Sequence, residues 1–357
     1  MPAPQLHLTF GSLVKDQPGI HPALRRACAA EPVYTRLGSI FHDLPYYGNM
    51  LAEAVRYGLG SPALDEPWAY RMHSVRPDRF VASFVRAAAI TPGDLTRDER
   101  LALVGGLISH CALDLTLHPL VNYCARRDTA DHGGHESVHH RLTEKYQALL
   151  FHLERMGRDP IGTPEFRQMT RVVKTVPSLF GRARVEAPIA RFMQEAYRGA
   201  YGDAPDADTW ATWVRSFRHF GMLVSIPIAR HNSELKQRDP ELRPRYFDND
   251  VFRFWEFYAC SERRVTELGN LAYHYFDAGD FSTAAEDAFV RAARIDDLAE
   301  PGLVYPELLA ALPALPRLQV RCTPGITAPP GHEPWRKRDR RRLLRRKRRA
   351  ARVRRLG

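Results

Sequence analysis

The chain has 357 residues, of which 44% are hydrophobic, with 52 Lys and Arg against 41 Asp and Glu. That hydrophobic content supplies a packed core and excludes a globally disordered protein. The net charge of +11 lies in one segment, because residues 336–357 hold 14 Lys or Arg and one acid, which leaves 38 basic and 40 acidic residues in 1–335. The body is therefore close to neutral, at −2, and a function inferred from positive charge belongs first to the C-terminal tail.

The sequence shows no targeting or disulfide pattern. No run of about 18 uninterrupted apolar residues is present, so we expect no transmembrane segment. The first residues lack a basic stretch followed by an apolar one, which predicts a cytoplasmic protein without a secretory signal. The five cysteines are scattered and form no CxxC pair, which argues against a disulfide framework and a structural zinc knuckle.

Apolar residues recur at spacings of three and four along most of the chain, the period of an amphipathic helix. We therefore predict an all-α fold, a multi-helix bundle. Residues 1–310 form the helical domain, 311–334 a proline-rich linker, and 335–357 a basic tail expected to be disordered. The predicted helices cover 47–59, 78–90, 97–117, 136–156, 164–176, 187–201, 208–236, 251–278 and 282–298.

The predicted helix over 97–117 leads into a row of ionisable residues. His110, Asp114 and His118 are spaced four residues apart, which places them on one helix face. Their neighbours are apolar, so this face is expected to be partly buried. Burying three ionisable groups without partners is costly, whereas a bound metal ion satisfies all of them.

The next predicted helix carries a matching pair, His140 and Glu144, again four residues apart. Imidazole nitrogens and carboxylate oxygens are the ligands that zinc accepts in catalytic sites. Two helices that each present such residues can face one another across a bundle core. A single His-x3-Asp is common by chance, but the joint pattern is rare and favours a metal site.

The run from His110 through Asp114 and His118 to His140 and Glu144 resembles the zinc-dependent phospholipase C family. That family is all-helical, is related in fold to single-strand-specific zinc nucleases, and holds two or three zinc ions between helices. Three upstream segments extend the resemblance to about residues 5–150: Gln5–Gly11 with His7, Leu37–Tyr47 with Asp43, and Met72–Ser74 with His73.

The resemblance implies two sets of zinc ligands, with a third ion near His7 bridged by Asp114. The first set is Asp43, His73, His110 and Asp114, and the second is His118, His140 and Glu144. Secreted members bind the third zinc through an N-terminal tryptophan, and no tryptophan lies near the start of this sequence. His42 also stands where the family usually has a proline. The resemblance thus supports two Zn²⁺ ions more strongly than three.

A zinc pair would hold the oxygens of a phosphodiester and lower the pKa of a bound water toward about 7, which supplies the nucleophile. Asp43 is the candidate catalytic residue, because a carboxylate there can orient or deprotonate that water. The predicted function is a zinc-dependent phosphodiester hydrolase, phospholipase C-like, with a phospholipid among its candidate substrates.

Three alternatives remain open at this stage. The doublet His42–Asp43, with His21 upstream, is typical of HD-domain phosphohydrolases, which are also helical metal enzymes. A zinc nuclease of the related fold would use the same ligands. A non-enzymatic scaffold would bind polyanions through the tail, either nucleic acid or an anionic membrane surface. No aromatic residue follows Trp335, so base stacking by the tail is not indicated.

Overall fold

A computed structural model of the chain describes residues 4–49, 67–90, 95–173, 187–225 and 254–295, with residues 229 and 238. Every regular element in these ranges is a helix, which confirms the predicted all-α class. The elements are α1 (Pro4–Leu13), η1 (Val14–Asp16), α2 (Pro22–Ala30), α3 (Pro32–Ile40), η2 (Phe41–Asn49), α5 (Pro67–Ser74), α6 (Pro77–Ile90), α7 (Arg97–His132), α8 (Glu136–Met156), α9 (Pro164–Met169), α10 (Ala187–Tyr201), α11 (Ala207–Leu223), α14 (Phe254–Ala278) and α15 (Thr283–Ala293).

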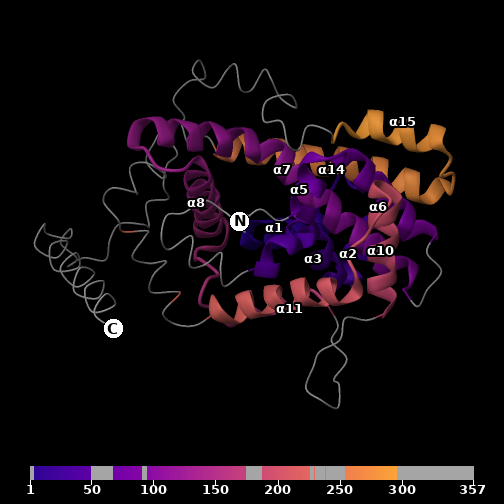
Figure 1. The fold of residues 1–357 in the computed structure, drawn as a ribbon, viewed down its shortest axis with the longest axis horizontal. Coiled ribbons are helices and arrows are strands. Elements are labelled where there is room, and N and C mark those ends of the chain that lie inside the picture. The colour runs from indigo at the N-terminus through magenta and orange to yellow at the C-terminus, as the bar shows by residue number, and fades with distance from the viewer. Residues whose placement is uncertain are drawn as a thin grey trace, which may run out of the picture.

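The long helix α7 is the centre of the fold. It contacts α1, α2, α3, α6, α8 and α14, and every residue from 101 to 117 is buried. In Figure 1, α7 runs across the upper part of the molecule and α11 along the lower edge, with α1 and α3 drawn between them. A helix that is covered on all sides is the core helix of this bundle.

Both ends of α7 are defined by local signals. The capping box anticipated at Thr96 and Glu99 is present, with each side chain bound to the other residue's backbone N–H. At the other end, Gly133 and Gly134 have φ angles of 70° and 92°, a conformation that glycine adopts readily. These two residues end α7, and α8 then runs down from beneath that end of α7 in the view of Figure 1 and contacts it.

Two glycines bring α3 and α7 unusually close together. A Cβ atom placed on Gly38 would lie 2.2 Å from the carbonyl oxygen of Leu103, and one on Gly106 would lie 2.1 Å from that of Thr35. Both obstacles are backbone atoms, which cannot rotate away. This close approach fixes α3 and α7 relative to each other. It thereby places the end of α3 and the middle of α7 in the site.

We predict that Gly106→Ala lowers the free energy of unfolding by about 1–3 kcal/mol or more, because the added methyl group forces α3 and α7 apart. Gly269→Ala in α14 is the matched control, since its new methyl group would meet nothing closer than 3.4 Å. Alanine also favours a helix over glycine by about 1 kcal/mol, so the control should be neutral or stabilising. Urea denaturation measures both, and equal effects would contradict the prediction.

The structure corrects the predicted extent of α7. The helix was expected to end at residue 117, before Pro119, but it continues through that proline to His132. Proline removes one backbone donor, here the bond to the carbonyl of Leu115. On either side of the proline α7 is tied to a neighbour, since Thr116 hydrogen-bonds Ser261 of α14 and Asn122 lies 2.9 Å from His140 of α8. The extension matters because it lets α7 and α8 lie side by side.

Three other helices are shorter than predicted. The segment expected over 164–176 ends at Met169, and the next residue, Thr170, packs closely against Gly221 of α11. The one expected over 208–236 ends at Leu223, where the carbonyl of Val224 accepts a hydrogen bond from the N–H of Gly162 at 2.7 Å. The one expected over 282–298 ends at Ala293, before Arg294 in a left-handed conformation with φ 47°.

Several helices in the first 75 residues were not predicted, namely α1, α2, α3, η2 and α5. In α1, residues 4–11 are all buried, polar ones included, so the helix lacks the exposed polar face that an amphipathic period would mark. Most of the helix predicted over 47–59, together with the linker over 311–334 and the tail over 335–357, lies outside the described residues.

Among the described helices, α7 is long and apolar enough to meet a length and composition criterion for a membrane span. However, 94% of its most apolar stretch is buried inside the fold. The core helix of a bundle meets the same criterion, so this feature is weak support for a span.

Candidate metal centre

The structure brings together all eight residues that the sequence singled out as metal ligands. They come from five elements: His7 from α1, Asp43 from η2, His73 from α5, the row His110, Asp114 and His118 from α7, and His140 and Glu144 from α8. They form three groups in which the potential ligand atoms lie within 4.8 Å of one another: His7, His110 and Asp114; Asp43, His73 and His110; His118, His140 and Glu144.

The approach of α3 to α7 places the first part of the site. His110 follows Gly106 by one helical turn, and its Nδ1 lies 3.0 Å from the carbonyl oxygen of Ser39 near the end of α3. The chain then passes directly into η2, which carries Asp43. The Oδ1 atom of Asp43 lies 3.9 Å from His110 Nε2 and 3.5 Å from His73 Nε2.

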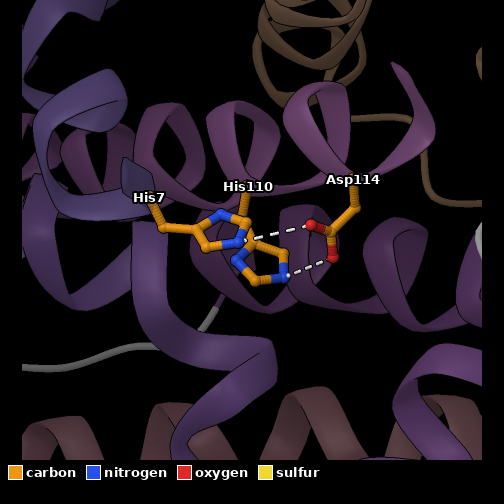
Figure 2. A group of neighbouring side chains, drawn as sticks. All are labelled: His7, His110 and Asp114. Carbon is orange, nitrogen blue, oxygen red and sulfur yellow. Dashed lines mark ion pairs between the residues drawn. The ribbon is translucent and has the colours of Figure 1, made fainter. Parts of the chain in front are cut away.

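Asp114 lies at the middle of the site and joins its parts. Its Oδ2 is 3.0 Å from His110 Nε2, whereas its Oδ1 is 3.3 Å from His7 Nε2 and 3.6 Å from His118 Nε2. Figure 2 shows the rings of His7 and His110 one against the other, each paired with a different oxygen of this carboxylate. A carboxylate placed in this way can bridge two cations.

The second part of the site lies between α7 and α8. Glu144 Oε1 is 3.3 Å from His118 Nε2 and 3.1 Å from His140 Nε2. The part of α7 beyond Pro119 also contributes, because Asn122 Oδ1 lies 2.9 Å from His140 Nδ1. The arrangement matches the expected bundle site, in which facing helices each contribute histidine and carboxylate.

Three of the histidine rings are fixed through the nitrogen that faces away from the carboxylates. The Nδ1 atoms of His110, His73 and His140 lie at 3.0, 2.8 and 2.9 Å from the oxygens of Ser39, Ala69 and Asn122, respectively. An Nδ1–H that donates to such an oxygen leaves the Nε2 lone pair for a metal, as in most histidine metal ligands. Each ring is thus oriented before any ion binds.

The partners of the ring nitrogens also distinguish His140 from its neighbour His139. The Nε2 of His139 lies 2.8 Å from the carbonyl oxygen of Gly133, away from the carboxylate cluster. His140 instead has Nδ1 on Asn122 and Nε2 on Glu144. The sequence-based choice of His140, made because it has an acid four residues later, agrees with this geometry.

Sequence reasoning missed Asn122, and it considered His42 only as part of the HD doublet, not as a ring packed beside the ligands. Asn122 continues the row of residues four apart that includes Asp114 and His118, and that spacing was the available signal. His42 has no exposed surface and stacks on His110 with ring centroids 5.0 Å apart. The oxygens of Ser39 and Ala69 belong to the backbone, so no residue-type signal marks them.

The polar atoms of the site are buried with few hydrogen bonds among the described residues. Unpartnered atoms include both carboxylate oxygens of Asp43, Oδ2 of Asp114, Oε2 of Glu144, and Nε2 of His110 and His118. Buried carboxylates without hydrogen bonds are costly unless a cation compensates them. Clustered histidine nitrogens and carboxylate oxygens are also the donor set of zinc. These residues therefore fit a metal centre.

The electrostatics of the site depend on its paired charges. Burial opposes protonation of His110 and His118, but the carboxylates of Asp114, Asp43 and Glu144 outweigh it and raise both pKa values to about 9. Burial and the nearby His110 lower the pKa of His7 to about 4. Against the effect of burial, the surrounding histidines hold the pKa of Asp114 well below its usual range.

A family comparison matches this region. The model for zinc-dependent phospholipase C matches residues 6–216, more than half of the chain and inclusive of all eight residues. The chain belongs to the zinc-dependent phospholipase C family. No curated protein and no solved structure matches it significantly. Membership of this family supports the interpretation that the protein is a zinc-dependent hydrolase with a phospholipid-type substrate.

The geometry does not favour the HD-domain alternative. That interpretation used His21 as the upstream ligand, but His21 caps α2 through Ala23 N–H and stacks on Tyr273 with centroids 3.7 Å apart. His42, the other half of the doublet, is in none of the groups whose ligand atoms converge. Only Asp43 of that set lies in the metal centre.

We predict that loading zinc into the metal-free protein at pH 7 releases about two protons. His110 and His118 have pKa values of about 9, so both are protonated at pH 7 and must lose a proton to bind zinc. His7, with a pKa of about 4, is already neutral. Calorimetric titrations in buffers of different ionisation enthalpy measure the release, which should diminish as the pH rises past 9. A count near zero at pH 7 would contradict these pKa directions.

Proposed function

We propose that this protein hydrolyses the phosphodiester bond between glycerol and the headgroup phosphate of a phospholipid. The observation that carries the proposal is the convergence of histidine and carboxylate ligand atoms, buried or half-buried, from five elements, all within the region matched by the family. Two zinc ions are proposed, one held by Asp43, His73, His110 and Asp114 and one by His118, His140 and Glu144.

Zinc at these positions would neutralise charge on the phosphate oxygens and lower the pKa of a bound water. The protein itself holds the ligand side chains in fixed positions that are largely shielded from solvent. Asp114 spans the two ligand sets, since its two oxygens face His110 on one side and His118 on the other. It therefore fixes the separation of the two sets.

Asp43 is proposed as the residue that orients the attacking water and accepts its proton. It has no exposed surface, and its two oxygens face different histidines, Oδ1 toward His73 at 3.5 Å and Oδ2 toward His7 at 3.9 Å. One oxygen can bind a cation while the other accepts a proton. A carboxylate in this position serves as a general base without rearrangement.

We predict that Asp43→Asn lowers headgroup release from phosphatidylcholine by about 10²–10⁴-fold, because an amide cannot accept the proton. Retained fold, measured by circular dichroism, separates this loss from misfolding. Activity within a few-fold of the wild-type protein would exclude Asp43 as the base.

Adjacent histidines provide a matched pair of variants for the second ligand set. His140→Gln should lose zinc, measured by atomic emission, together with activity, whereas His139→Gln should retain both, because His139 faces the Gly133 carbonyl. Equal loss in the two variants would contradict the assignment of His140.

A zinc nuclease is the second candidate function, because the same ligand pattern serves both reactions. The two functions can be distinguished by giving the zinc-loaded protein either single-stranded DNA or phosphatidylcholine vesicles and measuring hydrolysis of each. Hydrolysis of DNA alone would overturn the phospholipase proposal. Hydrolysis of neither, with zinc bound, would overturn both.

We further propose that the tail over 335–357 attracts the protein to anionic membranes. Its sequence carries 14 Lys or Arg between 336 and 357, and each basic residue near an anionic surface contributes about 1 kcal/mol. A peripheral position at the membrane would then keep the protein near a phospholipid substrate.

Replacement of the five basic residues at 345–349 with glutamine is expected to weaken sedimentation with phosphatidylserine-containing vesicles by at least about tenfold. Binding of the unaltered protein should also weaken at high salt, because screening reduces the attraction. Vesicles of phosphatidylcholine alone are the control. Preferential binding to nucleic acid would assign the tail to the other polyanion.

A further inference from the structure

His110 belongs to two of the three convergent groups, so these two groups cannot both hold an ion through it. It is grouped with His7 and Asp114 and also with Asp43 and His73. Both groups rely on the same atom, because Nε2 is the nitrogen that faces the carboxylates. A neutral imidazole has one lone pair, so this nitrogen can bind one ion only.

The His110 ring is held in one orientation, so its Nε2 can face only one ion. Its Nδ1 is 3.0 Å from the Ser39 carbonyl oxygen. The ring also stacks on His7, with centroids 4.2 Å apart and planes at 22°, and on His42, at 5.0 Å and 6°. Rotation would break the hydrogen bond and both stacks, so the two overlapping groups are alternatives rather than neighbours.

Two observations favour the group with Asp43 and His73. Both oxygens of the fully buried Asp43 lack hydrogen-bond partners among the described residues, so this carboxylate needs a cation. His73 also has its Nδ1 fixed on the Ala69 carbonyl, which presents Nε2 as a ligand. In His7 the Nδ1 atom has no such partner within the described structure.

We propose that the protein binds two zinc ions rather than three, and that His7 is a positioning residue rather than a ligand. In this arrangement the Nε2–H of His7 is directed at Oδ1 of Asp114, 3.3 Å away. It thereby fixes the bridging carboxylate while Oδ2 faces the ion beside His110. The inference rests on the proposed zinc centre and concerns its occupancy and the role of α1.

Zinc content, measured by atomic emission after dialysis against a zinc buffer, tests the ligand assignment. The wild-type protein and His7→Gln should each hold two ions, and His73→Gln should hold one. Three ions in the wild-type protein would overturn the proposal. So would a loss of one ion in His7→Gln while His73→Gln keeps both, because His7 would then be the ligand.

The positioning role has a separate readout, the zinc affinity in competition with a chelator. His7→Phe keeps an aromatic ring against His110 but removes the N–H, and it should weaken binding of one ion by about 10–100-fold. His7→Gln restores a donor and should recover much of that loss. Wild-type affinity in His7→Phe, with the fold retained by circular dichroism, would overturn the role of His7.

These measurements do not depend on turnover, so the two proposals can fail separately. Two bound ions without hydrolysis of any phosphodiester would overturn the proposed function and leave the occupancy intact. Three bound ions with hydrolysis would do the reverse. A protein that binds no zinc would overturn both.

Discussion

The structure is organised around two buried carboxylates that require positive charge. Asp43 has no exposed surface, Asp114 has 2%, and both lie on or beside the core helix α7. Isolated carboxylates in such surroundings would be protonated or would destabilise the fold. Here four histidines, His7, His73, His110 and His118, present ring nitrogens within 4 Å of them. The core is therefore arranged to hold positive charge next to Asp43 and Asp114.

The helices supply this arrangement through contacts that lie outside the ligands themselves. Gly38 and Gly106 let α3 approach α7, and that approach places the Ser39 carbonyl against His110. The passage of α7 through Pro119 carries Asn122 to the Nδ1 of His140 on α8. Small residues and one tolerated proline thus set the distances between ligands that belong to different helices.

The sequence predicted five of the eight candidate ligands from spacing and the other three only by resemblance. His110, Asp114, His118, His140 and Glu144 lie on long regular helices, where a separation of four residues means a shared face. His7 lies on a helix with no polar face, and Asp43 on the 3-10 segment η2, so neither has a periodic signal. The elements α1, α3 and η2 were also missed, of which α1 is buried along most of its length and η2 is a 3-10 segment, although the all-α class was predicted correctly.

The face-to-face contact of His7 and His110 links the geometry of the site to its protonation. Two imidazolium rings at 4.2 Å would repel each other in a buried place, so only one of the pair can carry a proton. The pKa directions agree, with His7 lowered to about 4 and His110 raised to about 9. Without metal, the positive charge that Asp43 and Asp114 require comes from protons on His110 and His118. Zinc ions bound at these two histidines would replace those protons with a larger positive charge, so the metal-free centre already has its ligands arranged for binding.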